Sequence, residues 1–460
     1  MVLPEILHTI SLKLRSRGAK AIVVGGSVRD HFLQQAIKDY DIEVYGLDTL
    51  KELEDILSEY GTVNLVGKSF GVLKFVHHKE EYDFSFPRSE VKVSSGHKGF
   101  DVQIDGNMSF KTAAKRRDFT MNTLGYDIEE KCFLDPFNGQ RDIQKKILRH
   151  VDRHSFQEDP LRVYRAVQFL ARFEFVLAKE TEHLCQTMVE ENVLEELPKE
   201  RVYEEFKKLF LKAKKPSIGF EQMKVLGVLK YFPELEAIIG VPQSPKWHPE
   251  GDVWVHTMLS LDVMRELVKN KESKYCLKML FAILCHDLGK ATNTTVDEEG
   301  NIRSLGHEYA GVKLTKTFMY RLTEEHTFIS SLLPLIEHHL KPTQFYFSGA
   351  KNAAIRRLAT KVTIEELVLV AKADFLGRTT YEAKKGVYEA GLWLLEKAQK
   401  LHVKENPLEY FIQGKDLIAL GLKPSAEFTT IINRVYELQM DGVILSTEDA
   451  LKYVQKHYST

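Results

Sequence analysis

Cysteine is scarce in this sequence, and the few cysteines are not spaced for a metal site or a disulfide framework. The four are Cys132, Cys185, Cys276 and Cys285, and no Cys-x-x-Cys pair occurs. This usage is typical of a reducing compartment. The N-terminus does not resemble a signal peptide, and no apolar run approaches the ~20 residues of a membrane span. We therefore expect a cytoplasmic protein without membrane contact.

Net charge is also nearly absent, because 64 Lys and Arg balance 65 Asp and Glu and leave a formal charge of −1. The chain as a whole is not attracted to nucleic acid or membranes, so a polyanion would have to bind to a local basic patch. The hydrophobic share of 43% and the charged share of 28% exclude disordered and collagen-like chains. A length of 460 residues predicts about three domains.

Short strand patterns and helices alternate over residues 1–140, which predicts a mixed α/β domain. Strand patterns almost vanish afterwards, so we expect an all-α region over residues 141–241. Several prolines between residues 242 and 249 indicate a linker. A second all-α domain, rich in histidine, is expected over residues 242–400, followed by a helical tail over residues 401–460 without recognisable chemistry.

Two glycines follow the first strand pattern and open a helix. Gly25 and Gly26 allow the backbone to approach a triphosphate closely, and N–H groups at a helix start point toward such an anion. Arg29, in the first turn of the helix, can form two parallel hydrogen bonds to a phosphate. A glycine pair alone is most often an ordinary strand-to-helix turn, so this motif needs support from elsewhere.

That support comes from Asp39 and Asp41 on the next strand pattern. Alternate residues of a strand point to the same side, so the two carboxylates repel each other unless a cation lies between them. Oxygen-only ligands favour Mg²⁺, and two such ions could activate a hydroxyl and stabilise a leaving pyrophosphate. Alone, the pair could be an exposed strand edge, but the combination with the glycine turn is more specific.

The stretches Gly-Gly-Ser-Val-Arg-Asp and Lys-Asp-Tyr-Asp-Ile-Glu-Val resemble the nucleotidyltransferases typified by DNA polymerase beta. They are most similar to bacterial CCA-adding tRNA nucleotidyltransferases and poly(A) polymerases. The resemblance implies a polymerase-beta-like catalytic domain in which Gly26 and Arg29 bind the nucleotide. It also implies that Asp39 and Asp41 are catalytic and bind Mg²⁺. Asp83 is either a third carboxylate or an exposed strand residue.

Arg116-Arg117-Asp118 matches the Arg-Arg-Asp motif of the same family, although the residues alone could be a helix cap with a basic start. The resemblance implies that Arg117 contacts the nucleotide and that Asp118 and Asn122 shape the sugar pocket. Asp135-Pro136 fits the turn that closes the catalytic domain in this family.

Asp159, Arg162 and Arg165 are spaced to lie on one side of a helix. Asp159 before proline could be a helix cap. Alternatively, a carboxylate accepts a hydrogen bond from the amino group of cytosine or adenine while arginine donates to the ring, a pattern that guanine and uracil refuse. The motif resembles the family's Glu-Asp-x-x-Arg template, which implies that all three residues bind the nucleotide. Gln168 stands where the family commonly has arginine.

The basic run at Lys207, Lys208, Lys212, Lys214 and Lys215 is either a solvated face or a contact for the RNA backbone.

His256, His286-Asp287 and Asp374 form the last candidate site. Two imidazoles and two carboxylates suit a transition metal ion, which would acidify a water for attack on a phosphate ester. A lone His-Asp pair means little, but the set resembles the HD phosphohydrolases. That resemblance implies an HD domain acting on phosphomonoesters or 2′,3′-cyclic phosphates. The further histidines that could ligate or contact phosphate are His307, His338 and His339.

We therefore predict a CTP(ATP):tRNA nucleotidyltransferase that adds the 3′-terminal CCA, with tRNA, CTP and ATP as partners and no obligatory protein partner. The helical region 141–241 would be its neck and body, which select the nucleotide and bind RNA. The alternatives are an A-adding enzyme or poly(A) polymerase, a metal-dependent HD hydrolase whose first half binds RNA, and a non-catalytic RNA-binding module.

Overall fold

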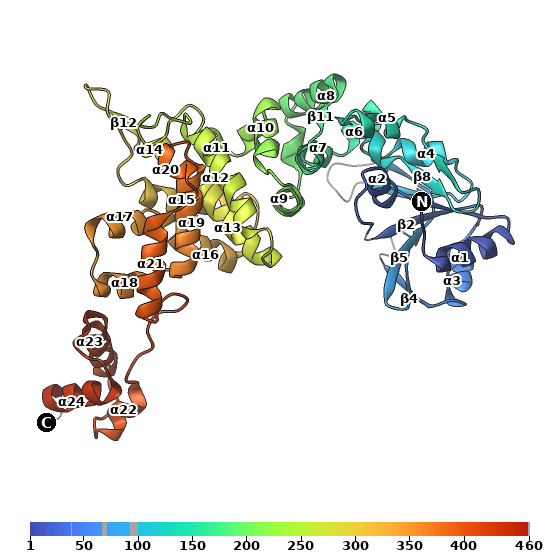
Figure 1. Cartoon of the computed structure of the whole chain (residues 1–460). Helices are drawn as coiled ribbons and strands as arrows, with labels where there is room; N and C mark the ends of the chain where they lie inside the picture. Colours follow the sequence, from blue (N-terminus) through green and yellow to red (C-terminus); the bar gives the residue numbers. More distant parts are fainter. Residues whose placement is uncertain (38, 67–70, 93–99, 459–460) are drawn as a thin grey trace. The chain divides into compact units, whose positions relative to one another are not determined.

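The computed structural model describes residues 1–37, 39–66, 71–92 and 100–458. The chain divides into two compact units, Met1–Tyr231 and Phe232–Thr460. The first unit begins with a mixed α/β region, and the rest of it and the second unit are mainly helical (Figure 1). This agrees with the expected α/β start followed by all-α regions. Within the part of the chain that is described, every helix is too short or too polar to cross a lipid bilayer.

A sheet of seven strands forms the centre of the first region, in the order β3-β4-β5-β2-β1-β8-β9. Its strands are β1 (Lys20–Val24), β2 (Tyr40–Tyr45), β3 (Thr62–Val66), β4 (Val72–His77), β5 (Glu80–Ser85), β8 (Gly125–Asp127) and β9 (Cys132–Leu134). Neighbouring strands are antiparallel except for β2 and β5, which run parallel with Asp41 opposite Asp83. The register therefore places two acidic residues side by side near the sheet centre.

Four helices belong to this region: α1 (Glu5–Arg15), α2 (Gly26–Phe32), α3 (Leu50–Ser58) and α4 (Phe110–Lys115). Helices α1 and α3 contact each other, and α2 contacts both β1 and β2 (Figure 1). A separate hairpin is formed by β6 (Arg88–Lys92) and β7 (Phe100–Ile104). Gly25, between β1 and α2, has a φ of +68°, a conformation that glycine adopts without steric cost.

The helical remainder of the first unit is built on α7 (Leu161–Phe173), which contacts α9 (Lys199–Lys212) and α10 (Ser217–Val225). Around it lie α5 (Gly139–Gln144), α6 (Arg153–Glu158), α8 (Lys179–Glu190) and the short pair β10 (Ile147–Leu148) and β11 (Val176–Leu177). Apolar side chains of α7 fill the core, whereas Arg162 and Arg165 are only half-buried. This amphipathic pattern fixes the face that the two arginines present.

The second unit contains α11 (Pro233–Glu236), α12 (Val253–Val268), α13 (Ser273–Cys285), α14 (Lys290–Asn293), α15 (His307–Tyr320), α16 (His326–His338), α17 (Lys341–Ser348), α18 (Asn352–Ala359), α19 (Ile364–Gly377), α20 (Tyr381–Lys384) and α21 (Glu389–Lys400), with a small hairpin of β12 (Thr295–Val296) and β13 (Ile302–Arg303). Helix α12 packs along α13 and α19. A Cβ atom at Gly377 would overlap Ser260, so this glycine permits the close approach of α12 and α19.

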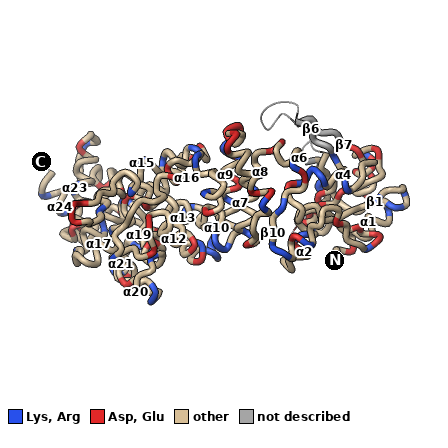
Figure 2. Tube along the Cα trace, turned by 90° about the horizontal axis from the view of Figure 1, so that it is seen from above, with Lys and Arg blue, Asp and Glu red and all other residues tan. Residues whose placement is uncertain are grey.

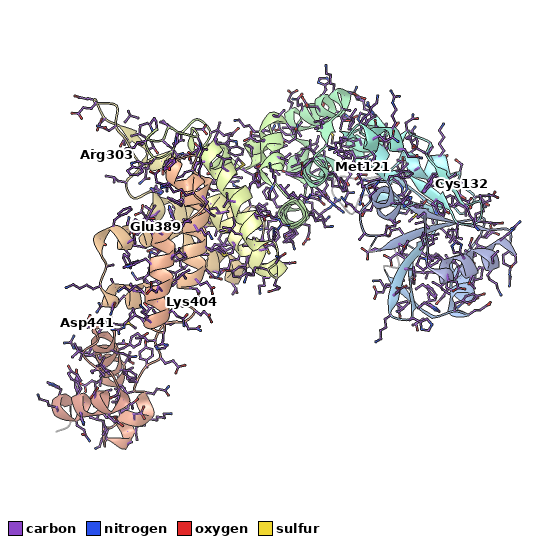
Figure 3. The ribbon with its side chains drawn as sticks, in the orientation of Figure 1. Met121, Cys132, Arg303, Glu389, Lys404 and Asp441 are labelled. Atoms are coloured by element: carbon purple, nitrogen blue, oxygen red, sulfur yellow. The ribbon has the colours of Figure 1, made fainter. Side chains whose placement is uncertain are left out.

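The tail has a small core of its own. Helices α22 (Gly414–Ala419), α23 (Glu427–Asp441) and α24 (Thr447–Tyr458) surround the buried side chains of Ile412, Leu417, Ile431, Val435, Ile444, Ala450 and Val454. Asp441, labelled in Figure 3, ends α23 and lies 2.7 Å from Arg357 of α18.

Replacing Gly377 tests the contact between α12 and α19. Alanine favours a helix over glycine by about 1 kcal/mol, but overpacking costs about 1–3 kcal/mol, so we expect Gly377→Ala to destabilise the second unit. Trp247, Trp254 and Trp393 are the only tryptophans of the chain, so tryptophan fluorescence during urea unfolding reports this unit alone. Lys372→Ala on the same helix should change the unfolding free energy by about 0.5 kcal/mol or less. A Gly377→Ala protein more stable than the original would contradict the prediction.

Candidate active sites

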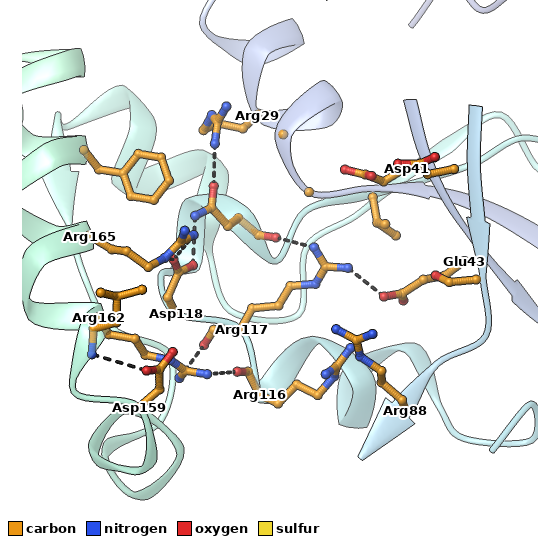
Figure 4. Close-up of a pocket in the computed structure, with 18 of the residues that line it drawn as sticks. Arg29, Asp41, Glu43, Arg88, Arg116, Arg117, Asp118, Asp159, Arg162 and Arg165 are labelled. Carbon is orange, nitrogen blue, oxygen red and sulfur yellow. Dashed lines mark hydrogen bonds and ion pairs between the residues drawn. The ribbon is translucent and has the colours of Figure 1, made fainter. Parts of the chain in front are cut away.

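The first unit contains a pocket of about 510 Å³, here called the arginine-rich pocket (Figure 4). It is lined by Val24, Gly25, Gly26, Arg29, Asp41, Glu43, Val72, Asp83, Ser85, Arg88, Arg116, Arg117, Asp118, Asn122, Asp159, Leu161, Arg162, Arg165, Phe169 and Arg201. These residues come from the end of β1 and the turn into α2, from strands β2, β4, β5 and β6, from the segment that follows α4, and from helices α7 and α9 with the turn before α7. Three separate sequence motifs therefore meet in one cavity.

The carboxylates on β2 and β5 lie on one side of this pocket. Asp41 and Asp83 line it, whereas Asp39, which immediately precedes β2, is exposed and is not among the lining residues. Burial raises the pKa of Asp41, Arg117 opposes the rise, and Asp83 and Asp39 add to it. Within the described residues, no ion pair or hydrogen bond engages the side chains of these three. The donor set is oxygen only, which fits Mg²⁺.

Glu43, two residues after Asp41, forms a buried ion pair that sequence reasoning missed. Its Oε1 lies 2.7 Å from Nη2 of Arg117, and the hydroxyl of Tyr45 donates to its Oε2 at 2.6 Å. Burial would raise the pKa of Glu43, but Arg117 and Tyr45 hold it below its usual value. A Cβ at Gly25 would lie 2.8 Å from Nη1 of Arg117, so the glycine leaves room for the guanidinium. The alternation of residues 39, 41 and 43 along one strand could have predicted that Glu43 lies on the same side as the two aspartates.

A chain of hydrogen bonds connects Arg29 of α2 to Arg165 of α7 (Figure 4). Arg29 donates to Oδ1 of Asn122 at 2.8 Å, and Asn122 donates to Oδ1 of Asp118 at 2.9 Å. Arg165 donates from Nε to Oδ2 of Asp118 at 2.8 Å. Burial would raise the pKa of Asp118, but Arg165 and Asn122 keep it below its usual value. Asp118 and Asn122 thus join the two helices, and Arg29 and Arg165 both lie over the ring of Phe169, 5.5 and 5.1 Å from its centroid.

Asp159 and Arg162 also line the pocket, with different partners. Oδ1 of Asp159 accepts from the backbone N–H of Leu161 at 3.3 Å, as a helix cap would, and Oδ2 lies 3.3 Å from Nη2 of Arg201. Arg162 donates to the backbone carbonyl of Arg116 at 2.6 Å. Gln168 is buried and is not among the lining residues.

The basic run of α9 is partly neutralised. Lys207 pairs with Glu204, and Nζ of Lys208 lies 2.7 Å from Glu205. Figure 2 shows blue segments gathering around α2, α6 and β10 of the same unit.

The second unit brings the predicted histidines and aspartates together, here called the histidine cluster. Nε2 of His256 lies 3.1 Å from Oδ1 of Asp374 and 3.9 Å from Oδ2 of Asp287. Nε2 of His286 lies 3.2 Å from Oδ2 of Asp287, but it is buried without a hydrogen-bond partner among the described residues. An imidazole nitrogen that lacks a hydrogen bond and lies 3.2 Å from a carboxylate oxygen fits a ligand of a transition metal ion.

Two of the three further histidines approach the other oxygen of Asp287. Nε2 of His307 lies 3.2 Å and Nε2 of His339 lies 3.8 Å from Oδ1. Lys290 contacts Oδ2 at 2.7 Å. No interaction within the described residues places His338 beside Asp287.

Glu250 orients His256 from outside the cluster, a contact that sequence reasoning did not assign. Its Oε1 lies 2.8 Å from Nδ1 of His256 and 2.9 Å from Nδ1 of His248. The other oxygen accepts from the backbone N–H of Thr379 at 3.1 Å. A carboxylate behind a ligating histidine fixes the ring and its tautomer, and Glu250 has this geometry.

Comparisons with known proteins match a different family model to each of three parts of the chain. The Poly A polymerase head domain matches residues 21–149, the probable RNA and SrmB-binding site of polymerase A matches residues 174–239, and the HD domain matches residues 253–378. A polymerase head with a carboxylate-lined pocket, followed by an HD domain, defines a nucleotidyltransferase of the poly(A) polymerase class.

A curated relative narrows the class. The Multifunctional CCA protein of Pasteurella multocida is 34% identical over 398 residues, which cover 84% of this chain and 91% of that protein. The chain belongs to the family of multifunctional CCA proteins.

Solved structures share the fold. The Thermotoga maritima CCA-adding enzyme complexed with tRNA has a TM-score of 0.61 at 20% identity, covering 99% of this chain and 96% of that one. The Bacillus stearothermophilus CCA-adding enzyme in complex with CTP has a TM-score of 0.62 at 19% identity, covering 99% and 98%.

The charge of Asp118 should make the stability of the first unit depend on pH. The pKa of Asp118 is lower in the folded protein than the ordinary value of 3.8. Its contribution to the free energy of unfolding is therefore complete above pH 3.8 and is lost as the pH falls through the folded-state pKa. We expect Asp118→Asn to cost about 1–3 kcal/mol at pH 7, because the half-buried Arg165 loses its charged partner.

The measurement is urea unfolding followed by far-UV circular dichroism at pH 7 and at steps below pH 4. The difference between the two proteins should shrink with acidity. Tryptophan fluorescence, which reports the second unit, should be unaffected by the substitution. A difference that stays constant with pH would exclude the ionised Asp118 as its source.

Proposed function

We propose that this protein adds cytidine, cytidine and adenosine to the 3′ end of tRNA, using CTP and ATP. The main support is the arginine-rich pocket, which joins Asp41, the glycine turn and Asp159 in one cavity. Relatives of the same fold were solved with CTP, with ATP and with tRNA.

In this proposal, the glycine turn and the cations around it hold the triphosphate. Gly26 lies at the start of α2, and Arg29 and Arg117 line the same wall. Asp39 and Asp41, with Asp83 as third carboxylate, would hold Mg²⁺, which lowers the pKa of the RNA 3′-hydroxyl and neutralises the departing pyrophosphate. The ion pair with Glu43 holds Arg117 in place beside them.

Residues of α7, together with Asp159 just before it, would select the base. The carboxylate of Asp159 accepts from the amino group of cytosine or adenine, and an arginine donates to the neighbouring ring nitrogen. We propose Arg162 and Arg165 for this wall of the pocket, which both residues line. Arg165 forms an ion pair with Asp118, which fixes the direction of its guanidinium.

The domain limits follow from the same assignment. We propose residues 1–140 as the catalytic domain, 141–241 as the neck and body that select the nucleotide and bind RNA, 242–400 as the HD domain and 401–460 as a helical tail. The four cysteines are all free thiols, which supports a location in the cytoplasm.

The HD domain is proposed to hydrolyse phosphomonoesters or 2′,3′-cyclic phosphates. His256, His286, Asp287 and Asp374 would hold a transition metal ion, which supplies an acidified water. Lys290, 2.7 Å from Asp287, is available to neutralise phosphate charge at the same place.

Primer extension tests the polymerising activity. A tRNA that lacks its last three nucleotides should gain two cytidines with CTP alone and a terminal adenosine when ATP is added, as read by sequencing the product end. Asp41→Asn should lower the rate by at least a hundredfold, because a neutral amide cannot hold the ion. Failure to incorporate cytidine would favour an A-adding enzyme or poly(A) polymerase, and full activity of Asp41→Asn would favour an HD hydrolase with an RNA-binding half.

Metal content tests the histidine cluster separately. His286→Asn should remove most of the transition metal that co-purifies with the protein, measured by inductively coupled plasma mass spectrometry, together with phosphatase activity. His338→Asn is the matched control, because His338 also lies in the second unit but, within the described residues, its ion-pair partner is Glu337 and not Asp287. Equal metal content in the two variants would contradict the assignment.

A further inference from the structure

Arg378 directly follows the last residue of α19 and lies beside the histidine cluster. Its Nη2 contacts both oxygens of Asp374, at 2.9 Å and 3.2 Å. Oδ1 of Asp374 also lies 3.1 Å from Nε2 of His256, so the guanidinium and the imidazole share one carboxylate oxygen. An arginine that no sequence motif considered above includes therefore lies next to two of the predicted metal ligands.

The contact with Asp374 leaves most of the guanidinium unused. A two-pronged arginine–carboxylate pair forms two parallel hydrogen bonds from two nitrogens, whereas here a single nitrogen of Arg378 contacts both oxygens. Within the described residues, Nε of Arg378 is buried without a hydrogen-bond partner, and no interaction engages Nη1. Buried polar groups are rarely left unpaired in proteins, so these donors indicate that a further acceptor binds here.

The backbone on both sides of Arg378 is fixed. Its own N–H donates to the carbonyl of Phe375 at 3.3 Å. The N–H of the next residue, Thr379, donates to Oε2 of Glu250 at 3.1 Å, and Oε1 of Glu250 lies 2.8 Å from Nδ1 of His256. Glu250 thus connects the segment that carries Arg378 to the ring of His256. A group held in this way loses little conformational freedom when it binds a ligand.

The charges of the cluster indicate which ligand these donors suit. Asp287 and Asp374 repel an anionic ester, and each is paired with one cation, Lys290 and Arg378 respectively. Lys290 already donates to Oδ2 of Asp287 and to Oε1 of Gln243, both at 2.7 Å. Arg378 therefore has more donors that remain available to an anion. Its side chain is 21% exposed, so a ligand can reach it from solvent.

We propose that Arg378 binds the phosphate of the ester that the HD domain hydrolyses. A planar guanidinium presents N–H donors that match the oxygens of a phosphate, and it stays charged at every physiological pH. Arg378 holds the phosphate beside the metal ligands, while Asp374 keeps the guanidinium in place. This inference rests on the proposed hydrolase function and adds a substrate-binding residue to it.

Steady-state kinetics of the full-length protein with p-nitrophenyl phosphate test this assignment. Arg378→Gln should raise both KM and the inhibition constant of inorganic phosphate about ten- to hundredfold, because both molecules carry the group that the guanidinium contacts. The change in kcat should be smaller. Guanidinium chloride, below the concentrations that unfold the protein, should restore part of the activity of Arg378→Ala and should not stimulate the wild-type protein.

Two controls separate phosphate binding from support of Asp374. The content of transition metal, measured by inductively coupled plasma mass spectrometry, should be equal in Arg378→Gln and the wild-type protein. Arg357→Gln is the matched variant, because it removes another ion-paired arginine of the same unit, the partner of Glu437 and Asp441. It should leave KM and the inhibition constant unchanged.

Unchanged constants in Arg378→Gln, or loss of the metal from this variant, would overturn the inference. If Arg378→Gln does not fold, as judged by circular dichroism, Arg378→Lys decides, because it keeps the charge without the forked donors and should still raise both constants. A wild-type protein that hydrolyses no phosphate ester would instead refute the hydrolase function. Isothermal titration calorimetry with inorganic phosphate then decides the inference, since Arg378→Gln should bind it more weakly than the wild-type protein does.

Discussion

The buried ion pair between Glu43 and Arg117 connects the two sides of the arginine-rich pocket. Glu43 lies on β2 with the carboxylates, and Arg117 belongs to the segment whose Asp118 and Asn122 join α2 to α7. Removing two charges from water costs several kcal/mol, and their attraction repays this only when geometry and hydrogen bonding are good. The pair therefore adds little to stability in net terms and instead fixes where the strand and the segment lie relative to each other.

The pocket resolves the apparent conflict between a neutral chain and a polyanionic substrate. Its lining contains seven arginines and five carboxylates, although the whole chain carries a formal charge of −1. The positive excess is thus local, and most of its members are held by named partners. Arginine suits this role because a planar, permanently charged fork can contact a carboxylate and a phosphate at once. A chain with almost no net charge attracts a polyanion only weakly over long distances. Recognition of the substrate therefore depends on contacts made inside the pocket.

The sequence predicted what depends on local periodicity and missed what depends on distant partners. Helical spacing predicted that Arg162 and Arg165 share a face, and both line the arginine-rich pocket. Strand alternation predicted that Asp39 and Asp41 share a side, but only Asp41 lines the pocket, so their pairing stays a prediction. The partner of Asp159 was missed because Arg201 comes from another helix, and the turn-like environment of Glu250 gives no periodic signal. The proposed domain limits at residues 140, 241 and 400 stay predictions.

The two sites differ in the type of ligand atom that they offer. Asp41 and Asp83 of the first unit offer only oxygen, the ligand type that Mg²⁺ prefers, whereas the histidine cluster mixes imidazole nitrogen with oxygen, as transition metals prefer. Because the two sets of residues lie in different compact units, a change in one ligand set leaves the other intact. Under the proposed function, this difference in ligand chemistry would allow one chain to carry both reactions.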